Sequence, residues 1–410
     1  MKVSKLTIIA LGLITGFLII SSCSNSRKAE DQPIVIMLSL DGFRWDYPDI
    51  YETPNLDKMA AEGVKANSLV PSFPTKTFPN HYSIATGLYP DHHGLVNNTY
   101  MDPERAEIFR LGDRAKVEDA YYYGGEPIWV TAEKQGIPTA SFFWVGSEAP
   151  IQDIQPGIWK KFDSSIPFET RMDSVLSWID LPAKKRPRLI TWYMEEPDHV
   201  GHDFGPVSEK TGQVISYLDS LLGVFIERLY SKDLDQEINF IVLSDHGMGE
   251  TKGNMYIDID ANLKAEWIQY ILGYNPVIFI EPEDGYADSV LMVLNKEENL
   301  SAWKKSDLPE HLNYGNNPRI SEIVVAADSG WSIGTDDIPD FEIGGAHGYD
   351  YRNKDMHAIF YAMGPAFKKA HSHPSFYNVD IYLLLADILN LEPAETDGNQ
   401  QRIVGMLKEE

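Results

Sequence analysis

The run Ile34-Val-Ile-Met-Leu-Ser-Leu40 indicates the fold class, and it ends at the turn signal Asp41-Gly42. A short, continuous run of apolar and β-branched residues with such an end is typical of a strand buried on both faces of a parallel sheet. Thr53-Pro54 then begins an amphipathic helix that Gly63 ends, because proline favours the first helical turn and glycine the position after the last. A buried strand followed by a helix is one unit of an α/β fold.

Two later segments repeat the pattern of an apolar strand followed by acidic residues. Leu189-Ile-Thr-Trp-Tyr-Met194 is expected to be a strand that ends near Asp198, and Asn239-Phe-Ile-Val-Leu243 one that ends at Asp245-His246. Open α/β sheets build their ligand crevices at the carboxyl ends of parallel strands. We therefore expect Asp198 and Asp245 to lie at the same edge of the sheet as Asp41.

The remaining chain completes an α/β domain. Apolar residues at helical spacing over Val214–Leu229 and Val379–Leu389 predict two more helices, and Ala358–Ala362 predicts a late strand. Residues about 250–340 alternate less cleanly, which indicates a smaller inserted cap. The expected fold class is α/β, with a central, mostly parallel sheet, helices on both faces and this cap.

Composition and charge exclude several classes of protein. The chain has 410 residues, of which 43% are hydrophobic, so its composition is globular and unlike that of collagen or disordered chains. Thirty-five basic and 61 acidic side chains give a net charge of −26, and this field repels polymeric nucleic acid, which is not expected as a partner. It also repels small phosphate esters unless bound cations reverse it locally. No protein partner is inferred.

The N-terminus resembles a bacterial lipoprotein leader. After a basic start, Leu6–Ile20 is an apolar run of 15 residues, shorter than the ~20 that span a bilayer as a helix. It ends at Ile20-Ser-Ser-Cys23, which resembles a lipobox with the only cysteine of the chain. We expect residues 1–22 to be a signal peptide, Cys23 to carry lipid, 23–32 to be a polar tether and 33–410 to form the globular part. The alternative is a cleaved signal with an incidental cysteine.

Acidic and imidazole side chains have the spacing of metal ligands. Asp198 and His202 stand four residues apart, so in a helix they share one face. His347 lies in Gly344-Gly-Ala-His-Gly348, where small residues let the backbone approach a crowded site. Each residue alone also has an ordinary interpretation, as a helix cap or a satisfied polar group. Together, at one sheet edge, they favour two metal ions, and zinc accepts this mixture of ligands. The candidate ligands are Asp41, Asp198, His202, Asp245, His246 and His347.

Thr77 is the candidate nucleophile. It precedes Pro79–Thr86, a segment with the signals of a helix start. A hydroxyl at a helix N-terminus faces the positive end of the dipole, and a nearby cation further favours its alkoxide. The alternative is that Thr77 only caps the helix.

Several motifs together resemble one enzyme family. The resemblance is carried by Thr77-Phe-Pro-Asn-His-Tyr82, Thr86-Gly-Leu-Tyr-Pro90, Gly125-Glu-Pro-Ile-Trp-Val-Thr131, Glu195-Glu-Pro-Asp198 with Gly201-His202, Ser244-Asp-His-Gly-Met248 and the His347 loop. In this order they are similar to the nucleotide pyrophosphatase/phosphodiesterases of the alkaline phosphatase superfamily, from about residue 34 to about residue 395.

The resemblance implies an alkaline-phosphatase-like α/β fold that holds two zinc ions. It implies that Asp41, Thr77, Asp245 and His246 surround one zinc ion, and that Asp198, His202 and His347 hold the other. It also places Asn98 beside the phosphoryl oxygens, where an amide can donate to developing charge.

The resemblance further implies an aromatic slot for the substrate. Phe78 and Phe162 match positions that sandwich a nucleobase, and Tyr193 matches one that lines the same slot. Phe162 departs from the tyrosine found in some relatives, which keeps stacking and removes a hydroxyl. Packing in the core remains the alternative for all three aromatic residues.

The activity implied is zinc-dependent hydrolysis of phosphodiester or pyrophosphate bonds in small nucleotides, through a threonine-bound intermediate that involves Thr77 and Asn98. The enzyme would lie outside the cytoplasm, anchored to a bacterial membrane through Cys23 on its periplasmic or cell-surface face. Alternatives on the same fold are a phosphodiesterase of choline-type lipids and a phosphomonoesterase, which the lack of arginine in the Thr77 and Asn98 motifs disfavours. A sulfatase would need Cys or Ser at position 77. A zinc-dependent binding lipoprotein would not need a threonine there.

Overall fold

The structure is a computed structural model that describes residues 32–232, 234, 237–335 and 343–409. The expected signal peptide, Cys23 and almost all of the tether lie outside these residues. No helix within the described ranges is long and apolar enough to cross a membrane.

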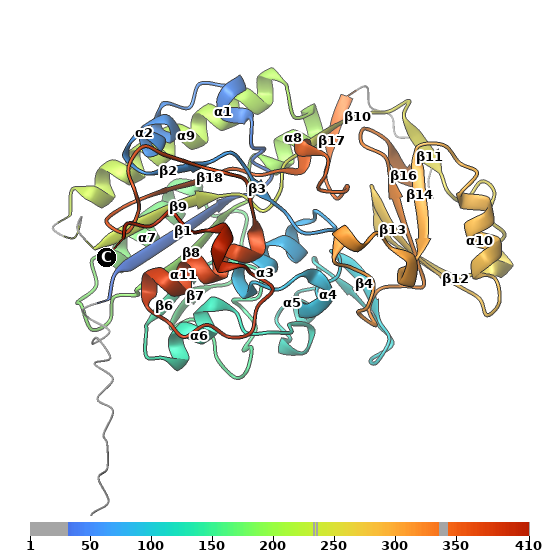
Figure 1. The fold of residues 1–410 in the computed structure, drawn as a ribbon, viewed down its shortest axis with the longest axis horizontal. Helices are drawn as coiled ribbons and strands as arrows, with labels where there is room; N and C mark the ends of the chain where they lie inside the picture. The colour runs from blue at the N-terminus through green and yellow to red at the C-terminus, as the bar shows by residue number, and fades with distance from the viewer. Residues whose placement is uncertain (1–31, 233, 235–236, 336–342, 410) are drawn as a thin grey trace, which may run out of the picture.

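One large sheet forms the centre of the molecule (Figure 1). Its strand order is β19-β2-β18-β9-β1-β8-β6-β7, and of the pairs described only those made by β18 are antiparallel. The strands are β1 (Ile34–Leu40), β2 (Val64–Ala66), β6 (Thr139–Phe142), β7 (Ile158–Lys160), β8 (Leu189–Met194), β9 (Ile238–Leu243), β18 (Phe360–Met363) and β19 (His371–His373). The predicted mostly parallel sheet is therefore confirmed, with β1 buried at its centre between β8 and β9.

Helices cover both faces of this sheet, because alternate residues of β1 point to opposite sides. Val35 and Met37 face a core shared with α3 (Thr77–Thr86), α6 (Ile128–Lys134) and α11 (Ile381–Leu389). Ile36 and Leu38 face a second core. That core is closed by α2 (Pro54–Glu62), α7 (Phe168–Ile179) and α9 (Glu209–Tyr230). Both faces are therefore shielded from water, as the apolar sequence of β1 predicts.

The predicted helix bounds hold to within a few residues. The helix expected from Thr53-Pro54 to Gly63 is α2. The one expected over Val214–Leu229 begins earlier, at Glu209, because the Ser208 hydroxyl caps it by accepting the Thr211 amide (3.1 Å). The late strand predicted from Ala358 begins at Phe360 as β18. It pairs antiparallel with β9, a direction that a run of apolar residues does not reveal.

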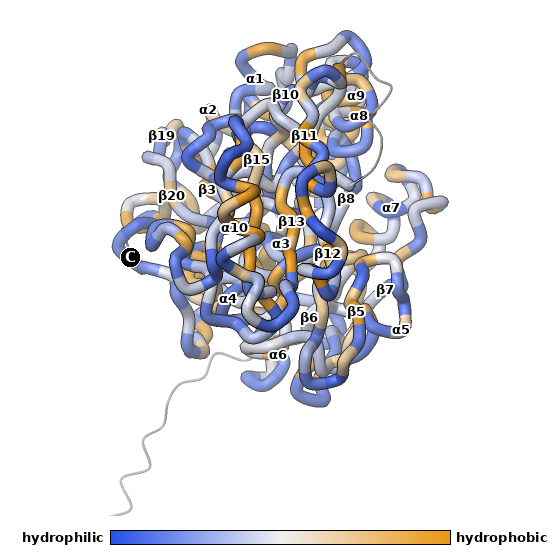
Figure 2. The backbone as a smooth tube through the Cα atoms, turned by 90° about the vertical axis from the view of Figure 1, so that its right-hand side faces the viewer, coloured by the Kyte–Doolittle hydropathy of each residue, from blue (hydrophilic) through white to orange (hydrophobic). Residues whose placement is uncertain are grey.

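A smaller antiparallel sheet lies beside the main one (Figure 1). It contains β12 (Ile268–Tyr274), β13 (Val277–Pro282), β15 (Ile323–Ala327) and β14 (Leu300–Lys304), in that order, and α10 (Ala287–Leu294) packs on it through Val290 and Leu294. Figure 2 shows β13 as a hydrophobic strand of this sheet. We call this unit the small lobe; the limits of a cap at about 250 and 340 stay a prediction.

The other described elements are short. They are α1 (Tyr47–Ile50), β3 (Leu69–Val70), α4 (Pro90–His93), β4 (Thr99–Asp102), β5 (Glu107–Arg110), α5 (Arg114–Val117), α8 (Asp198–Phe204), β10 (Gly249–Lys252), β11 (Tyr256–Asp258), β16 (Ser332–Gly334), β17 (Ile343–Ala346) and β20 (Phe376–Tyr377). The antiparallel pair β10 and β17 leads directly into the loop that carries His347.

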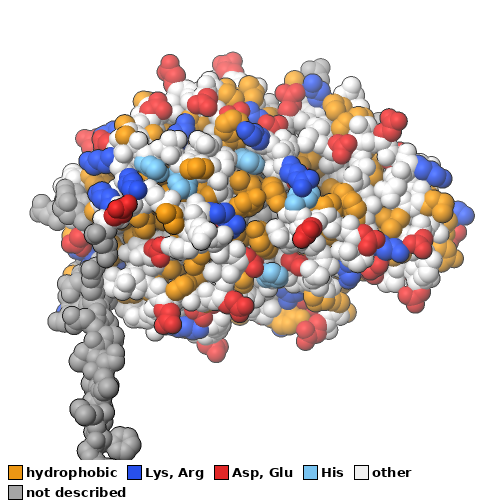
Figure 3. Space-filling view, viewed as in Figure 1, with side chains coloured by type: hydrophobic (Ala, Val, Ile, Leu, Met, Phe, Trp, Pro, Cys, Tyr) orange, Lys and Arg blue, Asp and Glu red, His pale blue; other side chains and the backbone are white. Residues whose placement is uncertain are grey.

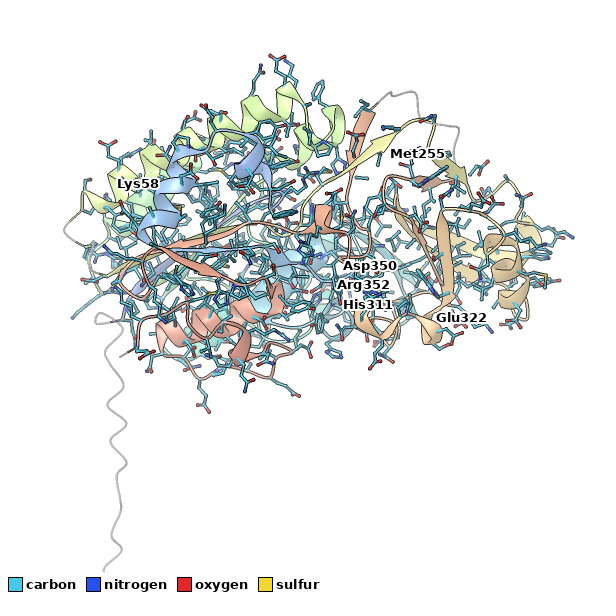
Figure 4. The ribbon with its side chains drawn as sticks, turned by 45° about the horizontal axis from the view of Figure 1, so that its top comes forward. Lys58, Met255, His311, Glu322, Asp350 and Arg352 are labelled. Carbon is cyan, nitrogen blue, oxygen red and sulfur yellow. The ribbon has the colours of Figure 1, made fainter. Side chains whose placement is uncertain are left out.

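Polar contacts fasten the small lobe to the main body. The Asp91 carboxylate accepts hydrogen bonds from the backbone amides of Gly315, Asn316 and Asn317, at 2.8–3.0 Å. A second contact joins His311 Nε2 to Asp350 Oδ2 at 2.8 Å. Figure 4 shows both side chains where the main body meets the small lobe. The lobe is thus held close to the loop that follows His347.

Candidate metal centre and active site

The carboxyl ends of β1, β8 and β9 bring the first group of candidate ligands together. Asp41 directly follows β1, and Asp245 and His246 follow β9. His246 Nε2 lies 3.4 Å from Asp41 Oδ1 and 3.0 Å from Asp245 Oδ2. The expected convergence of acidic residues at one sheet edge is therefore present.

The second group lies against the first. Asp198 begins α8, so the predicted helical spacing to His202 is present, and His202 Nε2 lies 3.5 Å from Asp198 Oδ1. His347 Nε2 reaches the same oxygen at 3.6 Å from the other side. The rings of His246 and His347 stack with centroids 3.6 Å apart, which joins the two groups into one centre.

Each imidazole is oriented by the main chain. The Nδ1 atoms of His202, His246 and His347 lie 2.7, 2.9 and 2.8 Å from the carbonyl oxygens of Gly345, Gly247 and Thr75. A carbonyl can only accept, so in each pair Nδ1 carries the hydrogen. When the ring is neutral, its lone pair then resides on Nε2, the atom that faces the carboxylates, as in histidines that bind a metal ion.

The donor set fits metal ions. Three carboxylate oxygens (Asp41 Oδ1, Asp198 Oδ1 and Asp245 Oδ2) are buried and have no hydrogen-bond partner among the described residues. Such oxygens are costly unless a cation compensates them. Two groups of three side chains each bring their ligand atoms within 4.8 Å of one another: Asp41, Asp245 and His246, and Asp198, His246 and His347. Carboxylate oxygens with imidazole nitrogens are ligands that zinc accepts.

The pKa values at this centre show the crowding of negative charge. Burial and the neighbouring Asp245 and Asp198 carboxylates raise the pKa of Asp41 well above its ordinary value. Burial also disfavours the charged form of Asp245, but His246 and His81 outweigh it and hold the pKa of Asp245 well below its ordinary value. A cation would favour the ionised form of both carboxylates.

The candidate nucleophile lies beside this centre. Thr77 is the first residue of α3, and its Oγ1 lies 3.3 Å from His246 Nε2. The cap position belongs to Lys76, whose side chain makes no capping hydrogen bond, and the Thr77 hydroxyl lies against His246, so the interpretation of Thr77 as a mere cap is not supported. The hydroxyl instead faces the candidate ligands at the positive end of the helix dipole.

Asn98 is held next to Thr77. Its Oδ1 accepts the backbone amide of Phe78 at 3.0 Å, and this fixes the orientation of the side-chain amide. The amide nitrogen is therefore the group that can donate to a ligand. Asn98 and Thr77 line the same cavity.

A cavity of about 460 Å³ opens over the centre. Its lining includes Asp41, Thr77, Phe78, Asn98, Phe162, Tyr193, Asp198, His202 and His347, which are nine of the residues singled out from the sequence. Phe162 is 37% exposed, and its ring lies 6.3 Å from that of Tyr193. The Tyr193 hydroxyl donates to Asp41 Oδ2 at 2.7 Å, a contact that the sequence does not reveal.

The cavity and its immediate surroundings also contain residues that sequence reasoning missed. Arg114, from the short helix α5, lines it and pairs with the Glu148 carboxylate, so the site does contain an arginine although the Thr77 and Asn98 motifs have none. Glu195 lines it as well and lies in the Glu195-Glu-Pro-Asp198 motif. His81, which nothing in the sequence selects, lies with Nδ1 3.3 Å from Asp245 Oδ2. Arg114 and Glu148 are 34 positions apart in the chain, so no local sequence pattern indicates that they pair.

Surface charge does not identify the site. Figure 3 shows acidic and basic side chains interspersed over the face that it presents, on the main body and on the small lobe. The candidate site is instead identified by the buried carboxylates of Asp41, Asp198 and Asp245 at the sheet edge.

Comparisons with known proteins agree with this geometry. Residues 35–350 match the family described as type I phosphodiesterase/nucleotide pyrophosphatase. A venom phosphodiesterase of Crotalus durissus collilineatus is 38% identical over 92% of this chain and 47% of its own length. The bovine ectonucleotide pyrophosphatase/phosphodiesterase family member 3 is 36% identical over 94% of this chain and 46% of its own length. The chain thus spans about half the length of the curated relatives it matches.

Solved structures show the same fold. Murine ectonucleotide pyrophosphatase/phosphodiesterase 5, solved as an inactive form in complex with AMP, superposes with a TM-score of 0.87. It is 35% identical, and the match covers 92% of this chain and all of that one. The human protein of the same name superposes equally well at 34% identity. Sequence, fold and comparison converge, and the chain belongs to the type I phosphodiesterase/nucleotide pyrophosphatase family.

Proposed function

We propose that this protein hydrolyses phosphodiester and pyrophosphate bonds of nucleotides and releases a nucleoside 5′-monophosphate. The observation that carries the proposal is the position of Thr77 Oγ1, 3.3 Å from His246 Nε2 and beside three buried carboxylate oxygens that lack a described hydrogen-bond partner. A hydroxyl beside metal ligands at the floor of a cavity suits nucleophilic attack on phosphorus.

The cofactors proposed are two zinc ions. Asp41, Thr77, Asp245 and His246 would hold one, and Asp198, His202 and His347 the other; His246 lies in reach of both groups. When bound, the ions lower the pKa of the threonine hydroxyl and of water, and neutralise charge on the phosphoryl oxygens.

The residues of the chain then perform a two-step displacement. Thr77 Oγ1 attacks phosphorus and forms a threonine phosphodiester while the alcohol or phosphate leaving group departs. Asn98 donates its amide to a non-bridging oxygen as charge develops there. Water next attacks the same phosphorus, releases the nucleoside monophosphate and returns the hydroxyl of Thr77.

The substrate is proposed to lie with its base in the slot lined by Phe78, Phe162 and Tyr193. The exposed ring of Phe162 offers a stacking face, and the AMP complex of the murine relative supports a nucleotide ligand. Choline-type lipid diesters and phosphomonoesters are the alternatives. The Arg114 guanidinium, which could favour a monoester, is already paired with Glu118 at 3.3 Å and with Glu148.

The proposed location is outside the cytoplasm. Lipid at Cys23 would anchor the chain to a bacterial membrane on its periplasmic or cell-surface face, with residues 23–32 as a tether. The support for this is the leader sequence.

The decisive experiment replaces the nucleophile. Thr77→Ala is expected to reduce turnover of the nitrophenyl ester of thymidine 5′-monophosphate at least about a thousandfold, because the covalent step is lost. Zinc content by elemental analysis should remain near that of the wild type. Thr86→Ser, at the other end of α3, is the control and should retain activity. Near-normal turnover by Thr77→Ala would reject the assigned nucleophile.

A second arm separates the alternatives. The wild type is assayed on ATP, a dinucleotide, a lysophospholipid and a nitrophenyl phosphate monoester, with products identified by chromatography. Release of nucleoside monophosphate from the first two supports the proposal. Preference for the lipid or for the monoester would favour the corresponding alternative.

A further inference from the structure

Two glutamate side chains that line the cavity are each paired with an arginine. Glu195 and Glu148 are lining residues, and each is less than 10% exposed. Glu148 pairs with Arg114, and Glu195 with Arg171. Each of these two carboxylates is therefore compensated by a guanidinium, although the candidate metal centre in the same cavity is rich in carboxylates.

Arg171 occupies an unusual position, because it contacts a residue that lines the cavity without lining the cavity itself. It lies in α7, is fully buried and is not itself part of the cavity lining. Its guanidinium forms a two-point pair with Glu195, in which Nη2 lies 2.8 Å from Oε1 and Nη1 contacts Oε2. Because the pair is bidentate, it fixes both the charge and the orientation of the Glu195 carboxylate.

The same guanidinium holds the wall that presents Phe162. Its Nε donates to the Ile166 carbonyl at 2.9 Å and its Nη2 to the Ser164 carbonyl at 3.3 Å. It also lies over the ring of Phe143, 5.1 Å from the centroid. One buried cation thus connects the loop of Phe162 with the end of β8 that carries Glu195.

We propose that Arg171 is a positioning residue that also determines specificity: by neutralising Glu195 it keeps a free negative charge out of the substrate slot and so disfavours ligands with a cationic headgroup. The inference rests on the proposed function, because it concerns the group attached to the phosphate. Without Arg171, the Glu195 carboxylate would face the slot unpaired and would attract a quaternary ammonium group.

The test compares two ligands that differ only in charge. Phosphocholine and 3,3-dimethylbutyl phosphate, an isostere whose headgroup is uncharged, are used as competitive inhibitors of hydrolysis of the thymidine monophosphate nitrophenyl ester. The measured quantity is the ratio of the inhibition constant of the isostere to that of phosphocholine. A purely structural role of Arg171 would weaken both inhibitors alike and leave this ratio unchanged.

Arg171→Met is expected to raise the ratio at least about tenfold, because an uncompensated carboxylate then faces the cationic ligand. Arg171→Met with Glu195→Gln should return the ratio to the wild-type value, since the charge is removed. Glu195→Gln alone should lower the ratio, because it leaves a buried guanidinium beside the slot. An unchanged ratio in Arg171→Met or, if that variant does not fold, in Glu195→Gln overturns the inference.

The chain offers a matched control. Arg188 is also buried, is paired with Glu237 at 2.9 Å and precedes the opposite end of the same strand, β8. Arg188→Met should lower stability without moving the ratio. If the wild type hydrolyses no diester at all, the proposed function fails; if it does and the ratios stay constant, only the inference fails.

Discussion

Tyr193 connects the proposed substrate slot with the candidate metal ligands. Its ring lines the cavity, and its hydroxyl donates to Asp41 Oδ2 at 2.7 Å. The hydrogen bond occupies one carboxylate oxygen and leaves Oδ1, the atom that faces His246, for a cation. A residue chosen from sequence as an aromatic wall therefore also orients a candidate ligand.

Tyr193→Phe is expected to keep the aromatic wall and to weaken the metal site. Loss of a hydrogen bond to a metal ligand typically costs about 10–100-fold in metal affinity or activity. The check is zinc release during chelator titration, together with kcat and KM for a nucleoside ester; kcat should fall more than KM rises. Tyr47→Phe is the control, because its hydroxyl is buried and has no partner among the described residues. Equal zinc release by the two variants would contradict this role of the Tyr193 hydroxyl.

Individual residues also show what sequence can predict. Asp41, Asp198 and Asp245 could be found because each follows an apolar strand, and parallel strands deliver their ends to one edge. Arg171 and Arg114 could not, because their partners Glu195 and Glu148 lie 24 and 34 positions away, brought near by packing. Spacing rules reach only neighbours on one element.

At the scale of elements, α3 depends on the short helix α4. His93, the last residue of α4, is fully buried, and its Nε2 lies 3.0 Å from Ser83 Oγ in α3. From the sequence it looks like a turn residue. Burial, more than any other cause, lowers the pKa of His93 to about 3, so the ring is neutral in the folded state.

This pKa shift predicts an acid-sensitive contact. Between pH 6.5 and about 3 the unfolded chain binds a proton at His93 that the folded chain does not, so stability is lost as pH falls through this window. His93→Gln should remove a part of the acid dependence with a slope of up to about 1.4 kcal/mol per pH unit. Urea unfolding at several pH values, with chelator present throughout, measures it. His92→Gln, an exposed neighbour, is the control; identical pH profiles of wild type and His93→Gln would refute the prediction.

The direction of β18 marks the limit of prediction for elements. Its apolar residues predict a buried strand, and the structure contains one, but nothing in such a run distinguishes parallel from antiparallel pairing. The sequence indicates the small lobe only as a cap within residues about 250–340, where apolar and polar residues alternate less cleanly. Its four-stranded sheet depends on the pairing of β13 with β15, which are distant in the sequence.

For the whole molecule, the junction between main body and small lobe is the structurally critical region. Asp91 is 6% exposed and accepts three backbone amides and the Asn316 side-chain amide. These donors come from the loop that precedes Arg319. The Arg319 guanidinium in turn forms an ion pair with Asp102, with Nε 2.8 Å from Oδ2. These buried polar groups add to an apolar interface, because Val277, Phe279 and Val324 of the small lobe belong to the same hydrophobic core cluster as the main body.

Asp91→Ala is expected to loosen this junction. Four donors lose a charged acceptor, and we expect the free energy of unfolding to fall by about 3 kcal/mol. Limited proteolysis should then cut within residues 313–319 before the rest of the chain, while denaturant unfolding reports the loss of stability. Asp284→Ala, on the exposed surface of the small lobe, should change neither. Unaltered proteolysis of Asp91→Ala would show that other contacts hold the lobe.

The order of the candidate ligands along the chain has a consequence for biosynthesis. A polypeptide made from its N-terminus displays the Asp41 carboxylate first and His347 only near the end. Until the strand pair β10 and β17 closes, the imidazole of His202 also lacks the Gly345 carbonyl that orients it, and His347 reaches the Thr75 carbonyl only when its loop packs against the segment before α3. A nascent or half-folded chain therefore cannot assemble the full candidate centre, which forms only once the loop of His347 has reached the Thr75 carbonyl.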